Sequence, residues 1–158
     1  SVEKAVRTIG IGSNNLKKIS TNSNLSMNFI ELEEEIKKDL KNNFTPLAII
    51  STFGTTGTVA FDSLKDIGKI GKKYKIWHHI DAAYAGVILF LEEYKHNAKY
   101  IKNADSLVFN PHKWMLTNFD CSLYFAKDKN KLIKALEIHP EYLKSEESKI
   151  NNYKDWID

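Results

Sequence analysis

The chain has 158 residues, of which 42% are hydrophobic and 27% are charged, a composition typical of a globular protein with one modest core. The net charge is only +3, and acidic and basic residues are interspersed, so nucleic acid is not expected as a partner. The longest apolar run, 82–91, is too short to cross a bilayer, and the first residues lack a signal peptide's apolar region. The single cysteine, Cys121, excludes an internal disulfide. We therefore predict a cytoplasmic protein that does not contact membranes.

The first part of the chain predicts a strand and a long connector. Residues 5–11 are short and partly alternating, which favours a strand that ends at Gly10. Residues 13–26 are rich in Ser, Asn and Lys, which is typical of a surface loop. We expect Ile19 or Leu25 to pin this loop to the core.

The next elements are a helix and a buried strand. Apolar residues recur at helical spacing over 29–40, and Asn28 is placed to cap that helix. Residues 46–52 form a continuous apolar run, which is typical of a buried parallel strand. The strand ends in the Gly- and Thr-rich segment 54–58. No Walker lysine follows it, so we favour hydroxyl groups that face a cofactor ring over a nucleotide site.

The rest of the pattern alternates helices with strands. Because the connections are short, it favours βαβ units, and the predicted fold class is α/β with a mostly parallel sheet and helices on both faces. The remaining predicted elements are a helix at 64–74 capped by Asp62 or Ser63, a strand at 76–81, a helix at 91–100, a strand at 106–109, an antiparallel strand at 118–125, and a helix opened by Asp128 with Leu132, Ile133 and Leu136 inward.

Two of these strands end in residues that suit one cofactor. Asn110-Pro111 stops an apolar run and places Lys113 just beyond the carboxyl end of a strand, the edge at which open α/β sheets bind ligands. A partly desolvated lysine there can attack an aldehyde to form a Schiff base. Asp81 ends another strand and can keep a pyridinium nitrogen protonated, while the small Ala83 leaves room for a flat ring. This combination points to pyridoxal phosphate.

The histidines near these positions have several possible roles. Neighbouring strand residues face opposite sides of a sheet, so His79 can share a face with Asp81 while His78 cannot. Two ligands are fewer than an ordinary zinc site requires, and no metal is expected. We predict instead that His79 hydrogen-bonds to Asp81 and orients its carboxylate. His112 lies beside Lys113, and it either contacts the substrate or a mobile loop or makes a structural hydrogen bond to its turn.

The segments 79–86 and 110–114, about two dozen residues apart, closely resemble the signature of the group II pyridoxal-phosphate-dependent decarboxylases. Within that group the chain is most similar to the aromatic L-amino-acid decarboxylases. Further similar segments lie at 1–5, 52–56, 118–122 and 142–144. The resemblance implies that residues 1–138 are the C-terminal half of the cofactor-binding large domain of a fold-type I enzyme, and that 139–158 form a mobile catalytic-loop segment.

The resemblance also implies a role for each matching residue. Lys113 would form the aldimine with pyridoxal phosphate, and Asp81 would pair with the nitrogen of the pyridine ring. Thr56 and Asn110 would contact the cofactor at its ring and phosphate sides, and Ala83 would pack against the ring.

The activity implied is decarboxylation of an L-amino acid, preferably an aromatic one, to its amine. Tyr142 matches a loop phenol that protonates the substrate carbon after carbon dioxide leaves, and aldehyde-forming relatives often carry phenylalanine there. The family forms homodimers. The resemblance covers only part of the family's usual length, so its ring-stacking histidine would precede Ser1, and the phosphate cradle and most of the C-terminal domain would also lie outside. Three alternatives stay open: an inactive truncated remnant, a partner-completing fragment, and an aldehyde-forming relative.

Overall fold

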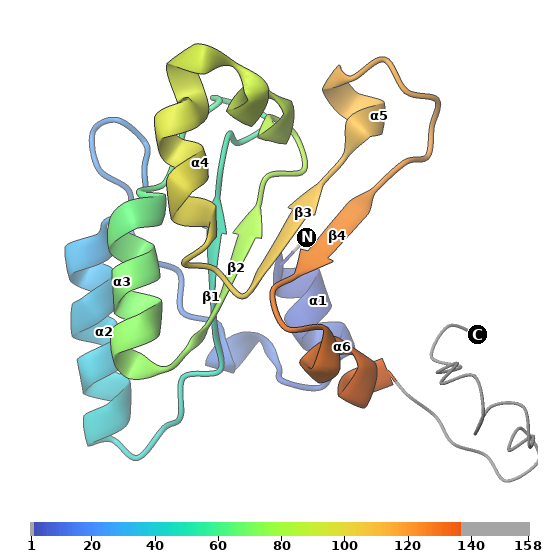
Figure 1. Ribbon diagram of the computed structural model, residues 1–158. Coiled ribbons are helices and arrows are strands. Elements are labelled where there is room, and N and C mark those ends of the chain that lie inside the picture. The colour runs from blue at the N-terminus through green and yellow to red at the C-terminus, as the bar shows by residue number, and fades with distance from the viewer. Residues whose placement is uncertain (1, 137–158) are drawn as a thin grey trace, which may run out of the picture. The chain divides into compact units, whose positions relative to one another are not determined.

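The computed structural model describes residues 2–136 of the protein (Figure 1). Those residues fall into two compact units, one ending at Phe125 and the other beginning at Ala126. In the second unit the described residues form helix α6 (Lys129–Leu136), in which Leu132 and Ile133 are half-buried but Leu136 is exposed, contrary to the prediction that it points inward. The predicted domain boundary after residue 138 lies outside the described residues and stays a prediction.

The sheet has four strands in the order β1-β2-β3-β4. The first three are parallel, with Thr52 paired to Asp81 and Asp81 paired to Val108. Figure 1 shows β4 running in the opposite direction to β3. The predicted α/β class with a mostly parallel sheet is therefore confirmed. The strands are β1 (Ala48–Thr52), β2 (Trp77–Asp81), β3 (Ser106–Phe109) and β4 (Leu123–Ala126).

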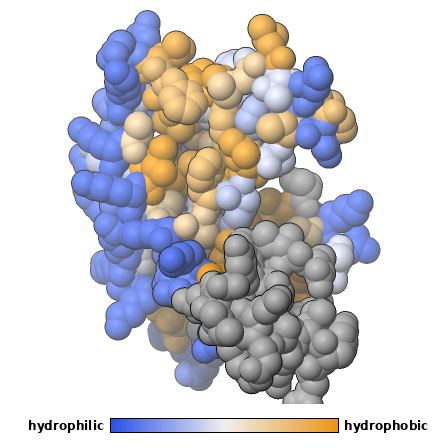
Figure 2. Space-filling view, turned by 45° about the vertical axis from the view of Figure 1, so that its right-hand side comes forward, coloured by the Kyte–Doolittle hydropathy of each residue, from blue (hydrophilic) through white to orange (hydrophobic). Residues whose placement is uncertain are grey.

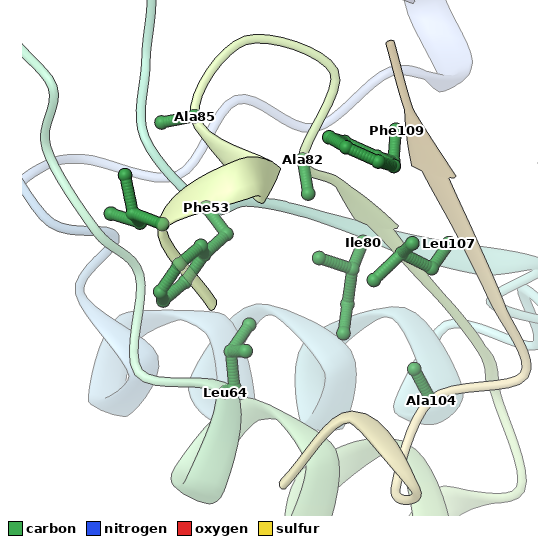
Figure 3. Close-up of a cluster of buried hydrophobic side chains, with 9 residues drawn as sticks. Phe53, Leu64, Ile80, Ala82, Ala85, Ala104, Leu107 and Phe109 are labelled. Atoms are coloured by element: carbon green, nitrogen blue, oxygen red, sulfur yellow. The ribbon is translucent and has the colours of Figure 1, made fainter. Parts of the chain in front are cut away.

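Helices cover one face of the sheet through two apolar clusters. One cluster joins α2 and α3 to β1 and centres on Ile49 and Ile67, and the other centres on Phe53 and Ile80 (Figure 3). Phe53, Ile67 and Ile80 are fully buried, so these contacts exclude water from that face. The helices of the first unit are α1 (Val2–Thr8), α2 (Phe29–Lys41), α3 (Leu64–Tyr74), α4 (Lys95–Ile101) and α5 (Pro111–Trp114), with 3₁₀ turns at Ser13–Asn15, Gly86–Phe90 and Glu92–Tyr94. None of the helices among residues 2–136 is long and apolar enough to cross a membrane.

The predicted strand at 5–11 is wrong, because this part of the chain begins with helix α1. Gly10 has a φ of +82°, and the amide of Gly12 donates to the carbonyl of Val6 at 3.0 Å. These are features of a helix C-terminus, where glycine adopts the left-handed conformation at little cost. The glycines that suggested the exit of a strand therefore mark the end of a short helix.

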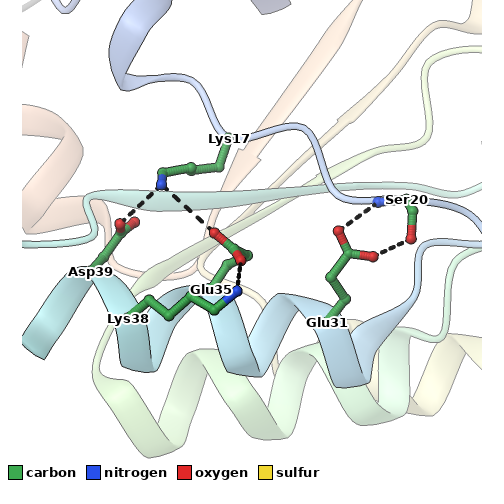
Figure 4. A network of polar contacts seen from close by, with 6 residues as sticks. All are labelled: Lys17, Ser20, Glu31, Glu35, Lys38 and Asp39. Carbon is green, nitrogen blue, oxygen red and sulfur yellow. Dashed lines mark hydrogen bonds and ion pairs between the residues drawn. The ribbon is translucent and has the colours of Figure 1, made fainter.

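The connector before α2 is pinned by Ile19 and by ion pairs. Ile19 packs against the cluster around Ile67, while the alternative pin, Leu25, is 50% exposed. The ammonium of Lys17 lies 3.2 Å from Asp39 and 3.6 Å from Glu35 on α2 (Figure 4). The predicted cap is confirmed, since the side chain of Asn28 accepts from the amides of Ile30 and Glu31 at 3.1 and 3.2 Å.

His78 is a fully buried histidine on the helix-covered face. Its Nε2 lies 2.8 Å from Oγ of Ser51, its Nδ1 has no hydrogen-bond partner within residues 2–136, and α3 packs directly over it at Gly71. Burial lowers the pKa of His78 from 6.5 to about 4, because the imidazolium would lose its hydration there.

We expect the neutral His78 to make folding depend on pH. The pKa of His78 is lower in the folded state, so its contribution to stability is complete above pH 6.5 and is lost as the pH falls toward 4. The shift corresponds to about 3 kcal/mol of unfolding free energy. Urea unfolding at several pH values should show this loss in the wild-type protein and not in His78→Leu. His96→Gln, a control at an exposed histidine, should keep the loss of stability at low pH. The prediction would be contradicted if the unfolding free energy of wild type and of His78→Leu changed equally with pH.

Candidate cofactor site

The carboxyl ends of β1, β2 and β3 meet at one edge of the sheet, as parallel strands require (Figure 1). Ligands bind at this edge in open α/β folds. The segments that leave it carry five of the predicted cofactor contacts, which are Thr56, Asp81, Ala83, Asn110 and Lys113. The structure thus gathers residues that are up to 57 positions apart in the sequence at a single edge.

The backbone on both sides fixes Asp81. Its Oδ1 accepts from the amide of Ala83 at 3.1 Å, and its carbonyl accepts from the amide of Phe53 at 2.8 Å. The next amide, that of Ala82, donates to the carbonyl of Val108 at 3.0 Å. Asp81 is half-buried, so a carboxylate with a fixed direction reaches the surface at the sheet edge.

Lys113 lies on the short helix α5, which starts at the buried Pro111. The amide of Lys113 donates to the carbonyl of Asn110 at 3.0 Å, and Oδ1 of Asn110 accepts from the hydroxyl of Ser122 at 2.8 Å. Lys113 itself is exposed, so within residues 2–136 the side chain lacks the partial desolvation expected from the sequence. Its amine is therefore presented to solvent from an anchored turn.

An aromatic contact joins the lysine turn to the segment that follows Asp81. The rings of Tyr84 and Trp114 meet edge to face with centroids 4.7 Å apart. Contacts of this kind stabilise by about 0.5–1.5 kcal/mol beyond the buried area. Lys113 precedes Trp114, so this contact holds the lysine turn close to the segment that follows Asp81.

The Thr56 loop depends on a glycine. Gly54 has a φ of +83°, and a Cβ there would collide with Cβ of Ala85, so only glycine allows the loop to pack this closely. Within the loop Oγ1 of Thr55 lies 2.6 Å from Oγ1 of Thr58, and it accepts from the amide of Ala60 at 3.1 Å. Thr56 is left exposed at the tip.

Asp62 does not cap helix α3, which was one of the two caps predicted from the sequence. The side chain of Ser63, and not that of Asp62, caps α3. The Asp62 carboxylate instead accepts from the amide of Met27 at 2.6 Å and from that of Thr52 at 2.7 Å. Hydrogen bonds to charged groups contribute about 1.5–3 kcal/mol, so Asp62 fastens the end of β1 just before the Thr56 loop. This role leaves no local signal in the sequence, because Met27 is 35 positions away.

His79 shares a sheet face with Asp81, as predicted, but its partner is another residue. Its Nδ1 lies 2.8 Å from Oγ of Ser106, in place of the expected bond to Asp81. Burial lowers the pKa of His79, and the nearby charge of Asp81 opposes that effect. Ser106 was not recognised in the sequence, since a serine inside an apolar strand carries no signal of its own.

His112 makes the structural contact that was one of its two predicted alternatives. Its Nδ1 accepts from the amide of Cys121 at 2.9 Å, which joins α5 to the chain that leads into β4. Cys121 is half-buried. Tyr142 lies outside the described residues, and its role stays a prediction. Within residues 2–136, no group of three His, Cys, Asp or Glu side chains could hold a metal ion.

Apolar side chains reach the surface around this region. Figure 2 shows apolar surface on the side of the molecule turned to the viewer, beside a hydrophilic margin. Leu116 is 98% exposed and Phe119 is 87% exposed. The other large apolar side chains exposed between α5 and the end of β4 are Trp114, Met115, Leu123, Tyr124 and Phe125. Apolar surface of this extent in a protein commonly marks a contact with another chain or segment.

Residues 1–157 match the family model described as the pyridoxal-dependent decarboxylase conserved domain. The chain belongs to this family. It is 40% identical over 161 aligned residues to tryptophan decarboxylase 2 of Oryza sativa subsp. japonica, covering 99% of this chain and 32% of that protein. It is 39% identical over the same length to phenylacetaldehyde synthase of Arabidopsis thaliana, covering 99% of this chain and 33% of that protein.

A solved structure agrees with these matches. The crystal structure of Oryza sativa TDC with PLP and tryptamine superposes with a TM-score of 0.88 at 30% identity, covering 96% of this chain and 31% of that one. The predicted family and the fold-type I large domain are thereby confirmed, and pyridoxal phosphate is the family's cofactor, as predicted. The chain spans about a third of the length of the curated relatives it matches.

The chemistry of the site residues fits pyridoxal phosphate. The fixed carboxylate of Asp81 suits a protonated ring nitrogen, and the exposed amine of Lys113 suits an aldehyde. Ala83 adds only a methyl group at the same edge.

Proposed function

We propose that the protein carries out the pyridoxal-phosphate-dependent decarboxylation of an aromatic L-amino acid to its amine. The observation that carries the proposal is the placement of the Asp81 carboxylate and the Lys113 turn at one sheet edge, joined through the contact between Tyr84 and Trp114. The named relatives favour an aromatic substrate, because one is a tryptophan decarboxylase and another is a phenylacetaldehyde synthase.

When bound, the cofactor supplies a conjugated ring that accepts the electron pair left by carbon dioxide. Asp81 would hold the proton on the pyridine nitrogen, since its carboxylate is fixed by the amide of Ala83. The amine of Lys113 would bond to the cofactor aldehyde. Thr56 and Asn110 would contact the ring and phosphate sides, and Ala83 would pack against the ring.

The direct test is carbon dioxide release and amine formation by the purified protein with pyridoxal phosphate. We expect activity with tryptophan, tyrosine or phenylalanine and little with glutamate. A chain that is folded and binds the cofactor but releases no carbon dioxide would instead favour an inactive remnant or a partner-completing fragment. Turnover of glutamate alone would contradict the aromatic assignment.

We also propose that the complete protein forms a homodimer. Support comes from the exposed apolar side chains between α5 and the end of β4, among them Leu116 and Phe119. Analytical ultracentrifugation would measure the mass of the assembly. The cytoplasmic location and the absence of a nucleic-acid partner stay predictions from composition and charge.

The proposed role of Tyr142 decides between two products. A phenol can protonate the substrate carbon once carbon dioxide has left, before oxygen reaches that carbon. We expect Tyr142→Phe to lower amine formation by about 100-fold, within the usual range for loss of a general acid, and to raise aldehyde, ammonia and peroxide. Chromatography of the products would measure the ratio, with Tyr100→Phe as the control. Unchanged amine yield without aldehyde would make Tyr142 an ordinary loop residue, and aldehyde from the wild type would favour the aldehyde-forming alternative.

A further inference from the structure

A chain of hydrogen bonds lies on the sheet face that carries Asp81. Nε1 of Trp77 donates to Oγ of Ser106 at 2.9 Å, and the same oxygen lies 2.8 Å from Nδ1 of His79. Ser106 is only 4% exposed and stands directly beside His79 in the register of β2 and β3. These three side chains therefore form a polar chain between two neighbouring strands.

The donors and acceptors in this chain determine where the protons lie. An indole N–H can only donate, so the oxygen of Ser106 accepts from Trp77. The hydroxyl proton of Ser106 then needs its own acceptor, and within residues 2–136 its hydrogen bonds offer Nδ1 of His79. A buried hydroxyl proton left unpaired would cost about 1–3 kcal/mol. This arrangement selects the His79 tautomer with a bare Nδ1 and the proton on Nε2.

The orientation of the His79 ring gives this tautomer a consequence. The ring stacks on Tyr124 of β4, with centroids 6.0 Å apart and planes 22° apart. In an imidazole Nδ1 lies next to the stem and Nε2 at the outer tip, so the N–H is presented at the tip of the side chain. His79 and Asp81 alternate along β2 and share its face, and burial lowers the pKa of His79, which favours the neutral ring.

We propose that Trp77 and Ser106 are positioning residues that hold His79 as the Nε2–H tautomer, so that it presents a hydrogen-bond donor on the face of Asp81. The positive end of an N–H dipole on that face favours an ionised carboxylate, whereas the other tautomer would present a lone pair. The consequence for catalysis rests on the proposed function, since an ionised Asp81 is what would hold the pyridine nitrogen protonated.

The other face of the sheet offers a matched control. Ser51 pairs with His78 at 2.8 Å, just as Ser106 pairs with His79, and both serines are buried, on the two strands that flank β2. Because His78 and His79 point to opposite faces, removing either hydroxyl should affect only its own histidine.

Nitrogen NMR of the cofactor-free protein, labelled at the histidine ring nitrogens, tests the tautomer directly. Bare and protonated ring nitrogens differ widely in chemical shift, and the signals lost in His79→Asn assign those of His79. We expect a bare Nδ1 in the wild type and a shift of Nδ1 toward the protonated position in Ser106→Ala. In Trp77→Phe the signal of Nδ1 should move in the same direction, because the oxygen of Ser106 no longer accepts from the indole and can accept from His79 instead. Ser106→Thr should restore the wild-type signal, and Ser51→Ala should leave His79 unchanged.

A protonated Nδ1 in the wild type would overturn the proposal, and so would an unchanged His79 signal in Ser106→Ala. If Ser106→Ala fails to fold, the wild-type spectrum and the Nδ1 signal of Trp77→Phe still show which tautomer His79 adopts and whether Trp77 controls it. In the cofactor-loaded enzyme we expect kcat to fall by about tenfold in Ser106→Ala, with less effect on KM and recovery in Ser106→Thr. Absence of carbon dioxide release by the wild type would overturn the proposed function and leave the tautomer result standing.

Discussion

Lys113→Ala is expected to abolish covalent attachment of pyridoxal phosphate to the protein. The anchored turn of α5 presents this amine at the same sheet edge as Asp81, and no other residue type in the site can bond to an aldehyde as an amine does. We expect carbon dioxide release to fall by at least about 100-fold, because both the bond to the cofactor and a group able to transfer protons are lost.

Borohydride reduction followed by peptide mass spectrometry measures this attachment. The wild-type protein should carry the cofactor on Lys113, and the Ala variant should carry none. Lys113→Arg keeps the positive charge but cannot serve as a nucleophile at neutral pH, so it should also lose attachment. Lys65→Ala, which removes an exposed lysine from α3, should retain it. Cofactor found on a different lysine in the wild type would refute the assignment.

The sequence was most informative where local chemistry and the period of apolar residues agree. Residues 46–52 and 106–109 are continuous apolar runs followed by turn residues, and both form parallel strands buried on their helix side. Asn28 and Ser63 cap helices because their side chains reach amides two or three positions away. Local signals of this kind need no knowledge of tertiary structure.

The features that the sequence did not predict depend on contacts between distant residues or belong to an element too short to show a clear pattern. The helix α1 has only seven residues, so its pattern could not be distinguished from that of a short strand. The bonds of Asp62 to Met27 and of His79 to Ser106 join residues 35 and 27 positions apart. Such pairs follow from the order and register of the strands, which a single sequence does not fix.

In the candidate site, the main residues could be predicted from the sequence but the contacts that support them could not. The carboxyl ends of parallel strands lie at one edge by geometry, so Asp81 and Lys113 could be placed together from the sequence. Their supports were not predicted, because the contact of Tyr84 with Trp114 and the close approach of Gly54 to Ala85 arise only when the loops pack.

Replacing Asp81 by asparagine should separate cofactor attachment from catalysis. The amide oxygen of Asn can still accept from the amide of Ala83, so the local fold should survive. The negative charge that holds a proton on the pyridine nitrogen would be lost. Removing one preorganised electrostatic contact of this kind typically lowers kcat by about 10²–10³-fold, and we expect a loss of that size. Attachment to Lys113 should persist, because the amine is unchanged.

The control is a carboxylate at the opposite end of the strands. Asp105 precedes β3, and its Oδ2 accepts from the amide of His78 at 2.9 Å. Asp105→Asn can keep that hydrogen bond through its own amide oxygen, and it lies away from the edge where β2 and β3 end, so turnover should change little. Steady-state kinetics, together with borohydride trapping, would show Asp81→Asn with attached cofactor but slow carbon dioxide release. Turnover near that of the wild type in Asp81→Asn would mean that this carboxylate does not control the pyridine nitrogen.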